Sequence, residues 1–287
     1  MSGPRTRPPA VLIDDPADPR VLPYVAIRER DLVGRRGEFI AEGEVVLRVL
    51  LSAGARCRAT SLLIAENRLQ GLAELTQRVP PDVPIYVARP TVMDAITGFH
   101  IHRGVLAHGA RPPNLGAERL LAGLGREAMV MALFGVSNHD NMGGLFRNAA
   151  AFGVDAVLLD PKCCDPLYRK AIRVSVGAAL KVPFARLVAD EDPLALLEAH
   201  GFTPLALAPG GATRLSALAP APRAAILLGS EGAGLPVPIL ERAVTVSIPM
   251  VTGWDSLNVA AASAIALHCL TEARRTPQPG SGHASTA

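Results

Sequence analysis

The chain has 287 residues, of which 49% are hydrophobic and 19% charged, and it carries a formal net charge of +3 at pH 7. This length and hydrophobic content exclude a wholly disordered chain and allow one large domain or two, each with a substantial core. The small positive charge permits an anionic partner but does not require one.

The cysteines and the hydrophobic runs indicate the compartment. Four cysteines, at positions 57, 163, 164 and 269, form no CxxC pair, and none has a histidine at zinc-ligand spacing. No apolar run is long enough to span a membrane, and the basic N-terminus is not followed by the hydrophobic region of a signal peptide. We therefore expect a reduced, cytoplasmic protein.

The N-terminal part of the chain is predicted to be a small α/β domain behind a tail. Residues 1–20 are rich in Pro, Arg and Asp and are expected to be disordered. Residues 21–108 alternate short apolar strands with helices. Helices are expected at residues 39–53, 69–78 and 92–96, and strands at residues 61–65, 85–88 and 104–107.

A basic arm opens this first domain. It contains Arg28, Arg30, Arg35 and Arg36, and the planar guanidinium group is well suited to phosphate contacts. We expect the arm to bind folded RNA through phosphate positions and shape. The alternative is that these arginines only keep the domain soluble.

A second domain follows a linker. Residues 109–127 include Pro112 and Pro113 and lack periodicity, which is typical of a linker. Residues 128–275 form the second domain, and residues 276–287 are predicted to be a disordered tail. Strands are expected at residues 129–136, 154–159, 205–208, 225–228 and from residue 244, with helices at residues 145–152 and 193–200 and an Ala-rich helix up to His268.

This order predicts a parallel sheet, in which ligands usually bind outside the carboxyl ends of the strands. Three polar loops fall at such ends. In the first, Asn138 and Asn141 are expected to make a turn, and Gly143 to allow close backbone approach. Arg147 follows on an apolar helix, where a guanidinium group is costly unless it is paired. We expect it to face a ligand at the strand ends. The alternative is an internal salt bridge, for instance with Asp155 or Glu231.

The second loop places glycines 229, 232 and 234 around Glu231. Glycines let a cofactor lie against bare backbone, and the carboxylate can accept hydrogen bonds from ribose hydroxyls. The spacing is neither the dinucleotide fingerprint nor a phosphate loop. An ordinary structural turn is the alternative.

The third loop places polar residues where the Ala-rich helix begins. Thr252, Asp255, Ser256 and Asn258 lie where free N–H groups and the positive end of the helix dipole meet an electron-rich ligand. The alternative is an ordinary N-cap made by Asp255 or Ser256. The chain has no GxSxG elbow, HExxH motif or Ser-His-Asp order, which argues against the familiar hydrolases.

Together the loops resemble the three motifs of the SpoU (TrmH-like) family of RNA ribose 2′-O-methyltransferases, in the SPOUT class. The motif N-x-x-N-x-G-x-x-x-R is matched by Asn138, Asn141, Gly143 and Arg147. The motif G-S-E-G-x-G-L is matched by residues 229–235, and I-P-M with S-L-N-V by residues 248–250 and 256–259. The first domain is similar to ribosomal-protein L30e-like substrate-binding domains. His139 departs from the pattern, because Pro is frequent at its position.

The resemblance implies an α/β fold whose C-terminal SPOUT-type parallel-sheet domain contains a deep trefoil knot, and a homodimer formed through that domain. It implies S-adenosylmethionine as the methyl donor and rRNA or tRNA as the substrate, with no metal. The cofactor-binding residues implied are Leu228, Gly229, Ser230, Glu231, Gly232, Ile248, Pro249, Met250, Ser256 and Leu257.

The resemblance also assigns catalysis to Arg147, Asn141, Glu231, Ser256 and Asn258. Because an arginine is almost always protonated, we expect Arg147 to hold a phosphate and the developing oxyanion rather than to act as a base. Arg147 therefore joins the basic arm among the expected RNA-binding residues. Two other functions stay open: a catalytically silent RNA-binding protein of the same fold, and a Rossmann-type oxidoreductase, which the missing fingerprint disfavours.

Overall fold

The protein forms two compact units in the computed structural model. The sequence predicts two domains that are each one continuous segment of the chain, whereas each of these units is made of several separate segments. The first unit holds residues up to Leu115 with Ser137–Ala150 and Cys164–Pro183, and the second holds Gly116–Val136, Ala151–Cys163 and the chain from Phe184 onward. The structure describes residues 10–25, 37–98, 101, 103–219, 221–251, 253 and 256–275.

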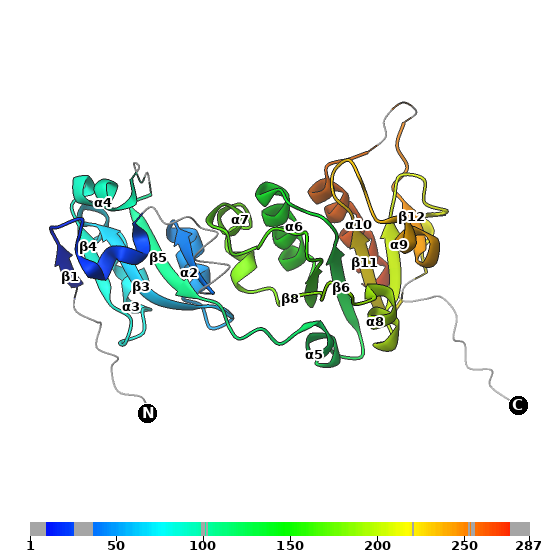
Figure 1. Cartoon of the computed structure of the whole chain (residues 1–287), viewed down its shortest axis with the longest axis horizontal. Helices are drawn as coiled ribbons and strands as arrows, with labels where there is room; N and C mark the ends of the chain where they lie inside the picture. Colours follow the sequence, from blue (N-terminus) through cyan, green and yellow to red (C-terminus); the bar gives the residue numbers. More distant parts are fainter. Residues whose placement is uncertain are drawn as a thin grey trace, which may run out of the picture. The chain divides into compact units, whose positions relative to one another are not determined.

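The first unit is built on a mixed five-stranded sheet, drawn in blue and cyan in Figure 1. Its order is β1-β4-β3-β5-β2, with β4 parallel to both of its neighbours and β5 antiparallel to both of its own. The strands are β1 (Ala10–Ile13), β2 (Glu38–Glu42), β3 (Arg58–Ala65), β4 (Ile85–Ala88) and β5 (Val105–Ala110).

Two segments of this unit differ from prediction. Ala10–Ile13, expected to belong to a disordered tail, pairs with β4, because the apolar run AVLI extends the sheet. The segment Glu38–Glu42 is a strand and not the start of a helix, because Gly43 has a φ of 94°, which a helix cannot contain, and the helix begins only after it.

The helical segments of the first unit are η1 (Pro19–Tyr24), α2 (Glu44–Leu50), η3 (Glu66–Arg68), α3 (Ala73–Gln77), α4 (Pro90–Thr97), α6 (His139–Ala151), α7 (Arg169–Val174) and η4 (Ala178–Leu180).

The second unit contains a seven-stranded sheet in which all described neighbours are parallel. All six residues of β6 are buried, as predicted from the continuous apolar run. The order is β10-β12-β9-β11-β6-β7-β8. The strands are β6 (Ala128–Leu133), β7 (Ala156–Leu159), β8 (Phe184–Arg186), β9 (Thr203–Leu207), β10 (Thr213–Arg214), β11 (Arg223–Leu228) and β12 (Val244–Ser247).

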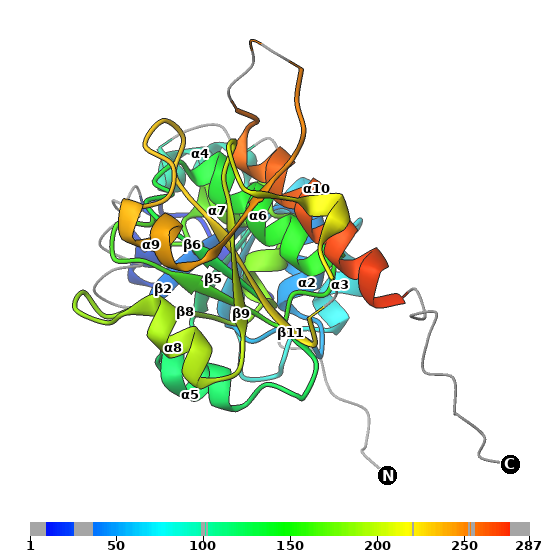
Figure 2. The same cartoon turned by 90° about the vertical axis from the view of Figure 1, so that its right-hand side faces the viewer.

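Helices cover both faces of this sheet. Alternate β6 residues, such as Val130, share a hydrophobic core with α5 (Ala117–Ala122), α8 (Pro193–Ala199) and α9 (Val237–Arg242). Figure 2 shows α10 (Val259–Arg275) across the strands from α8 and α9. The short η5 (Leu215–Ala217) lies against α10. Helix α5 falls inside the predicted linker, so part of that segment is ordered secondary structure.

None of the helices in the described ranges has the length and hydrophobicity that crossing a bilayer requires. The threading of the C-terminal segment into a knot and the L30e-like nature of the first domain stay predictions.

Candidate functional site

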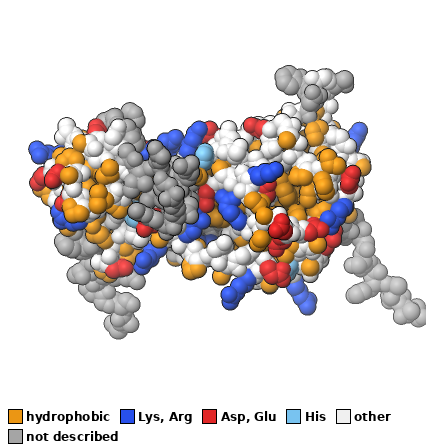
Figure 3. Space-filling view, viewed as in Figure 1, with side chains coloured by type: hydrophobic (Ala, Val, Ile, Leu, Met, Phe, Trp, Pro, Cys, Tyr) orange, Lys and Arg blue, Asp and Glu red, His pale blue; other side chains and the backbone are white. Residues whose placement is uncertain are grey.

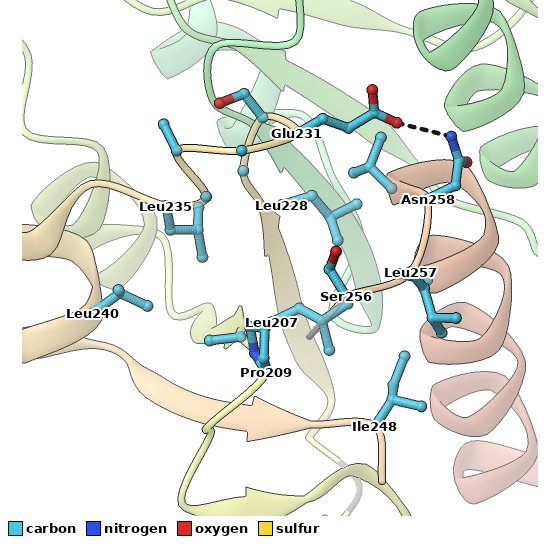
Figure 4. A pocket seen from close by; sticks show the side chains of 18 of the residues that line it. Leu207, Pro209, Leu228, Glu231, Leu235, Leu240, Ile248, Ser256, Leu257 and Asn258 are labelled. Atoms are coloured by element: carbon cyan, nitrogen blue, oxygen red, sulfur yellow. Dashed lines mark hydrogen bonds between the residues drawn. The ribbon is translucent and has the colours of Figure 1, made fainter. Parts of the chain in front are cut away.

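A cavity of about 700 Å³ opens at the carboxyl ends of β9, β11 and β12 in the second unit (Figure 4). Its volume falls within the range of about 300–1,000 Å³ that is typical of small-molecule sites. Its place at the strand ends is where ligands of open parallel sheets bind. Three groups of residues wall it: residues 207–209, residues 228–235, and a third group made by Ile248, Met250, residues 256–259 and Ala262.

The second wall is a glycine loop, by which we mean residues 229–234. A Cβ added to Gly229 would collide with the backbone of Gly234 and Leu235, so the loop folds back on itself only with glycine there. The N–H of Gly234 donates to the carbonyl of Ser230 at 3.0 Å and closes the loop. Gly232 has a φ of 90°. The loop therefore presents bare backbone to the cavity.

The third wall ends in the cap of α10. The side-chain oxygen of Asn258 accepts hydrogen bonds from the N–H groups of Ala260 at 2.9 Å and Ala261 at 3.3 Å. Asn258 is thus the N-cap, and the prediction that Ser256 caps this helix is wrong. Asp255, the other predicted cap, lies outside the described residues. Ser256 is exposed and lines the cavity two residues before the cap.

The two loops are joined by one side-chain pair. The amide nitrogen Nδ2 of Asn258 donates to Oε1 of Glu231 at 2.9 Å, the dashed line in Figure 4. Among the described residues that line the cavity, Glu231 alone is charged. The remaining lining is mostly apolar, with Leu228 at the end of β11 and Leu257 before the cap. The cavity thus combines apolar surface, bare backbone and one carboxylate.

Nine of the ten residues predicted to bind a cofactor line this cavity, and Pro249 does not. Sequence reasoning missed the wall after β9, made by Leu207, Ala208 and Pro209, and also Leu240 of α9. The available signal was the end of a predicted strand beside the two loops. Because strand order in a sheet is not visible in the sequence, that end was not placed next to them.

The first loop is shorter than predicted, because α6 begins at His139. Asn138 caps it: its Oδ1 accepts from the N–H of Asp140 at 2.8 Å, and its carbonyl accepts from the N–H of Met142 at 2.9 Å. Gly143 therefore lies inside the helix. A Cβ there would come within 2.6 Å of the Cβ of Val174, so the predicted close approach occurs between α6 and α7.

Arg147 lies on α6 and is exposed. The alternative of an internal salt bridge with Asp155 or Glu231 is not met: within the described part of the chain no ion pair involves Arg147. The Asp155 carboxylate accepts from the N–H of Met129 at 2.7 Å. Asn141 is buried, with 7% of its surface exposed. Neither Asn141 nor Arg147 is among the residues that line the cavity.

The expected RNA-binding arm, Arg28, Arg30, Arg35 and Arg36, lies outside the described residues. On the face seen in Figure 3, Lys and Arg side chains are interspersed with Asp and Glu and do not form one basic patch. No group of three His, Cys, Asp or Glu side chains in the described ranges is arranged to hold a metal ion.

Comparison with known proteins identifies the family. The profile of the SpoU rRNA Methylase family matches residues 128–268. An uncharacterized tRNA/rRNA methyltransferase of Mycobacterium tuberculosis is 39% identical over 275 residues, which are 93% of this chain and 93% of the relative. The chain belongs to the SpoU rRNA methylase family. The membership predicted from the three motifs is confirmed, and this SpoU methylase is accordingly an RNA methyltransferase.

Solved structures agree with the fold of this SpoU methylase. An AdoMet-bound rRNA methyltransferase from Sinorhizobium meliloti superposes with a TM-score of 0.74 at 24% identity, covering 93% of this chain and 98% of the other. An RNA 2′-O ribose methyltransferase superposes with a TM-score of 0.73 at 22% identity, covering 93% of this chain and all of the other. The predicted α/β, parallel-sheet SPOUT fold is thereby confirmed.

Proposed function

We propose that this SpoU-family enzyme transfers a methyl group from S-adenosylmethionine to a ribose 2′-hydroxyl of rRNA or tRNA. The observation that carries the proposal is the cavity at the strand ends, whose walls are the second and third motif loops. One structural neighbour is described as AdoMet-bound and another as an RNA 2′-O ribose methyltransferase. These descriptions support the donor and the acceptor respectively.

The residues present fit the cofactor. Leu228, Ile248, Met250 and Leu257 supply apolar surface for an adenine ring. Gly229, Gly232 and Gly234 line the cavity without side chains, so their backbone groups are open to a ligand. Glu231 supplies an acceptor for ribose hydroxyls or for a positive charge. When bound, S-adenosylmethionine supplies an electrophilic methyl group on a sulfonium centre.

Arg147 is assigned to the RNA side of the reaction. Its exposed guanidinium group is open to a phosphate, and a fork of donors also stabilises the oxyanion left when a 2′-hydroxyl gives up its proton. A protonated arginine does not take that proton itself. We assign Asn141, Ser256 and the Glu231–Asn258 pair the task of orienting the reacting groups.

RNA recognition is assigned to the first domain. The arginines of the basic arm would contact phosphates of a folded RNA, which is how double-stranded RNA is usually bound. We further propose that two chains associate through the C-terminal domain. Both assignments follow from the family resemblance and from the charge of the arm, Arg28, Arg30, Arg35 and Arg36.

Methyl-labelled S-adenosylmethionine and total RNA test this function on the purified protein. Alkali cleaves RNA through the 2′-hydroxyl, so a methylated ribose protects the adjacent bond. We expect label in alkali-resistant dinucleotides. Label confined to mononucleotides would indicate base methylation and contradict the proposal. Intact RNA binding without any label would support a catalytically silent protein of the same fold.

A further inference from the structure

We infer that Asn258 is a positioning residue. Its side-chain amide links the glycine loop to the first turn of α10 and so fixes the positions of two walls of the cavity relative to each other. The inference rests on the proposed function, since it concerns how the cavity keeps its affinity for S-adenosylmethionine. Within the Glu231–Asn258 pair, Asn258 acts through Glu231.

Both ends of the amide are engaged. The oxygen Oδ1 accepts from the N–H groups of Ala260 and Ala261, and the backbone carbonyl of Asn258 accepts from the N–H of Ala262 at 2.9 Å. The nitrogen Nδ2 donates to the carboxylate of Glu231 at 2.9 Å. One residue therefore fixes the start of α10 and the loop that follows β11.

The glycine loop needs such a tie. Residues 231–234 are exposed, and both Gly232 and Gly234 have positive φ angles, of 90° and 67°. Glycine-rich backbone has more conformations to lose than any other. The hydrogen bond from Gly234 to Ser230 closes the loop on itself, but it does not fix the loop against α10. The bond from Asn258 to Glu231 does.

Two substitutions can separate the capping of α10 by Asn258 from its hydrogen bond to Glu231. A serine at position 258 still caps a helix nearly as well as asparagine, but its hydroxyl is too short to donate to Glu231 as well. A glutamine at position 231 keeps a carbonyl oxygen that accepts from Nδ2 and loses only the charge. Asn258→Ser therefore separates the hydrogen bond to Glu231 from the capping of α10. Glu231→Gln separates that hydrogen bond from the charge of Glu231.

A second residue in the same unit provides a matched control. Asp192 caps α8 by accepting from the N–H groups of Leu194 at 3.0 Å and Ala195 at 3.2 Å, and its other oxygen accepts from Arg242 at 2.7 Å. It has the same two-sided arrangement as Asn258 but does not line the cavity. Asp192→Ser keeps that cap and removes that tie.

The test is calorimetric titration of the full chain with S-adenosylmethionine, together with the thermal midpoint of each variant. We expect Asn258→Ser and Glu231→Ala each to weaken binding by about tenfold. The double variant should be no weaker than Glu231→Ala alone, because that variant already lacks the Asn258–Glu231 hydrogen bond. Glu231→Gln, which keeps an acceptor for Nδ2, should lose less affinity than Glu231→Ala. Asp192→Ser should bind within about twofold of the unsubstituted chain, and Asn258→Ser should keep its thermal midpoint.

Each other result counts against the inference. Losses that add in the double variant, or unchanged affinity of Asn258→Ser, would mean that the tie does not act on the cavity. Equal losses in Glu231→Gln and Glu231→Ala would mean that Glu231 acts by its charge. A similar loss in Asp192→Ser would point to general destabilisation. If the unchanged chain does not bind S-adenosylmethionine, the proposed function itself fails, whatever the variants do.

Discussion

At the scale of single residues, Arg147 carries the proposed chemistry without belonging to the cavity. Because it lines no part of the cavity, Arg147→Ala should leave the affinity for S-adenosylmethionine within about twofold. Loss of a preorganised donor to a developing oxyanion should lower the single-turnover rate by about 10²–10³. Arg147→Lys should restore only part of the rate, because an ammonium group lacks the planar fork. An undiminished rate in Arg147→Ala, with cofactor saturating, would remove this role.

Cys57 offers a second test at this scale. Burial raises the pKa of its thiol to about 12, and the guanidinium groups of Arg111 and Arg56 offset only part of that rise. Only the thiolate is nucleophilic, so at pH 8 Cys57 of the native chain should react with iodoacetamide far more slowly than half-buried Cys164 and Cys269. Peptide mapping by mass spectrometry measures this. Labelling of Cys57 as fast as Cys269 would show that the first unit opens there.

At the scale of elements, helices and strands with a clear hydrophobic pattern were predictable. Helix ends and very short strands were not. The strand at Ile85–Ala88 matches its predicted position. The Ala-rich helix α10 forms as predicted but continues past His268 to Arg275. The start of α6 was misplaced because two glycines look like a turn, whereas the Asn138 cap and packing against α7 keep them helical. Short strands such as β8 give no periodic signal at all.

Helix α10 should depend on an arginine in its last turn. One terminal nitrogen of Arg274 donates to the carbonyls of Ala128 at 2.8 Å and of Ala221 and Pro222 at 3.2 Å each, just before or at the starts of β6 and β11. Arg274→Met keeps the aliphatic length but none of the donors.

This change should lower the local stability of α10 by about 1.5–3 kcal/mol, the usual value for hydrogen bonds to a charged group. Hydrogen exchange of the α10 amides should accelerate correspondingly, by about 10- to 100-fold. Exchange rates equal to those of the unchanged chain would mean that the helix is held by its apolar face alone.

At the scale of the whole molecule, the site was more predictable than the molecule that contains it. Three loops at strand ends predicted one ligand site, because carboxyl ends of parallel strands share an edge. The second and third loops line the cavity, whereas the first does not. The wall after β9 required the strand order, and the discontinuous units required packing that composition does not encode. The knot, the homodimer and the L30e-like first domain stay predictions from the family resemblance.

The central claim is that S-adenosylmethionine occupies the cavity at the strand ends, and titration of two glycine variants tests it most directly. A Cβ at Gly229 would collide with the backbone of the glycine loop, whereas a Cβ at Gly210, just past the wall after β9, meets nothing within 4 Å. The unchanged chain and Gly210→Ala should bind S-adenosylmethionine equally, and Gly229→Ala should lose binding. A folded Gly229→Ala protein that binds the cofactor with undiminished affinity would contradict the claim.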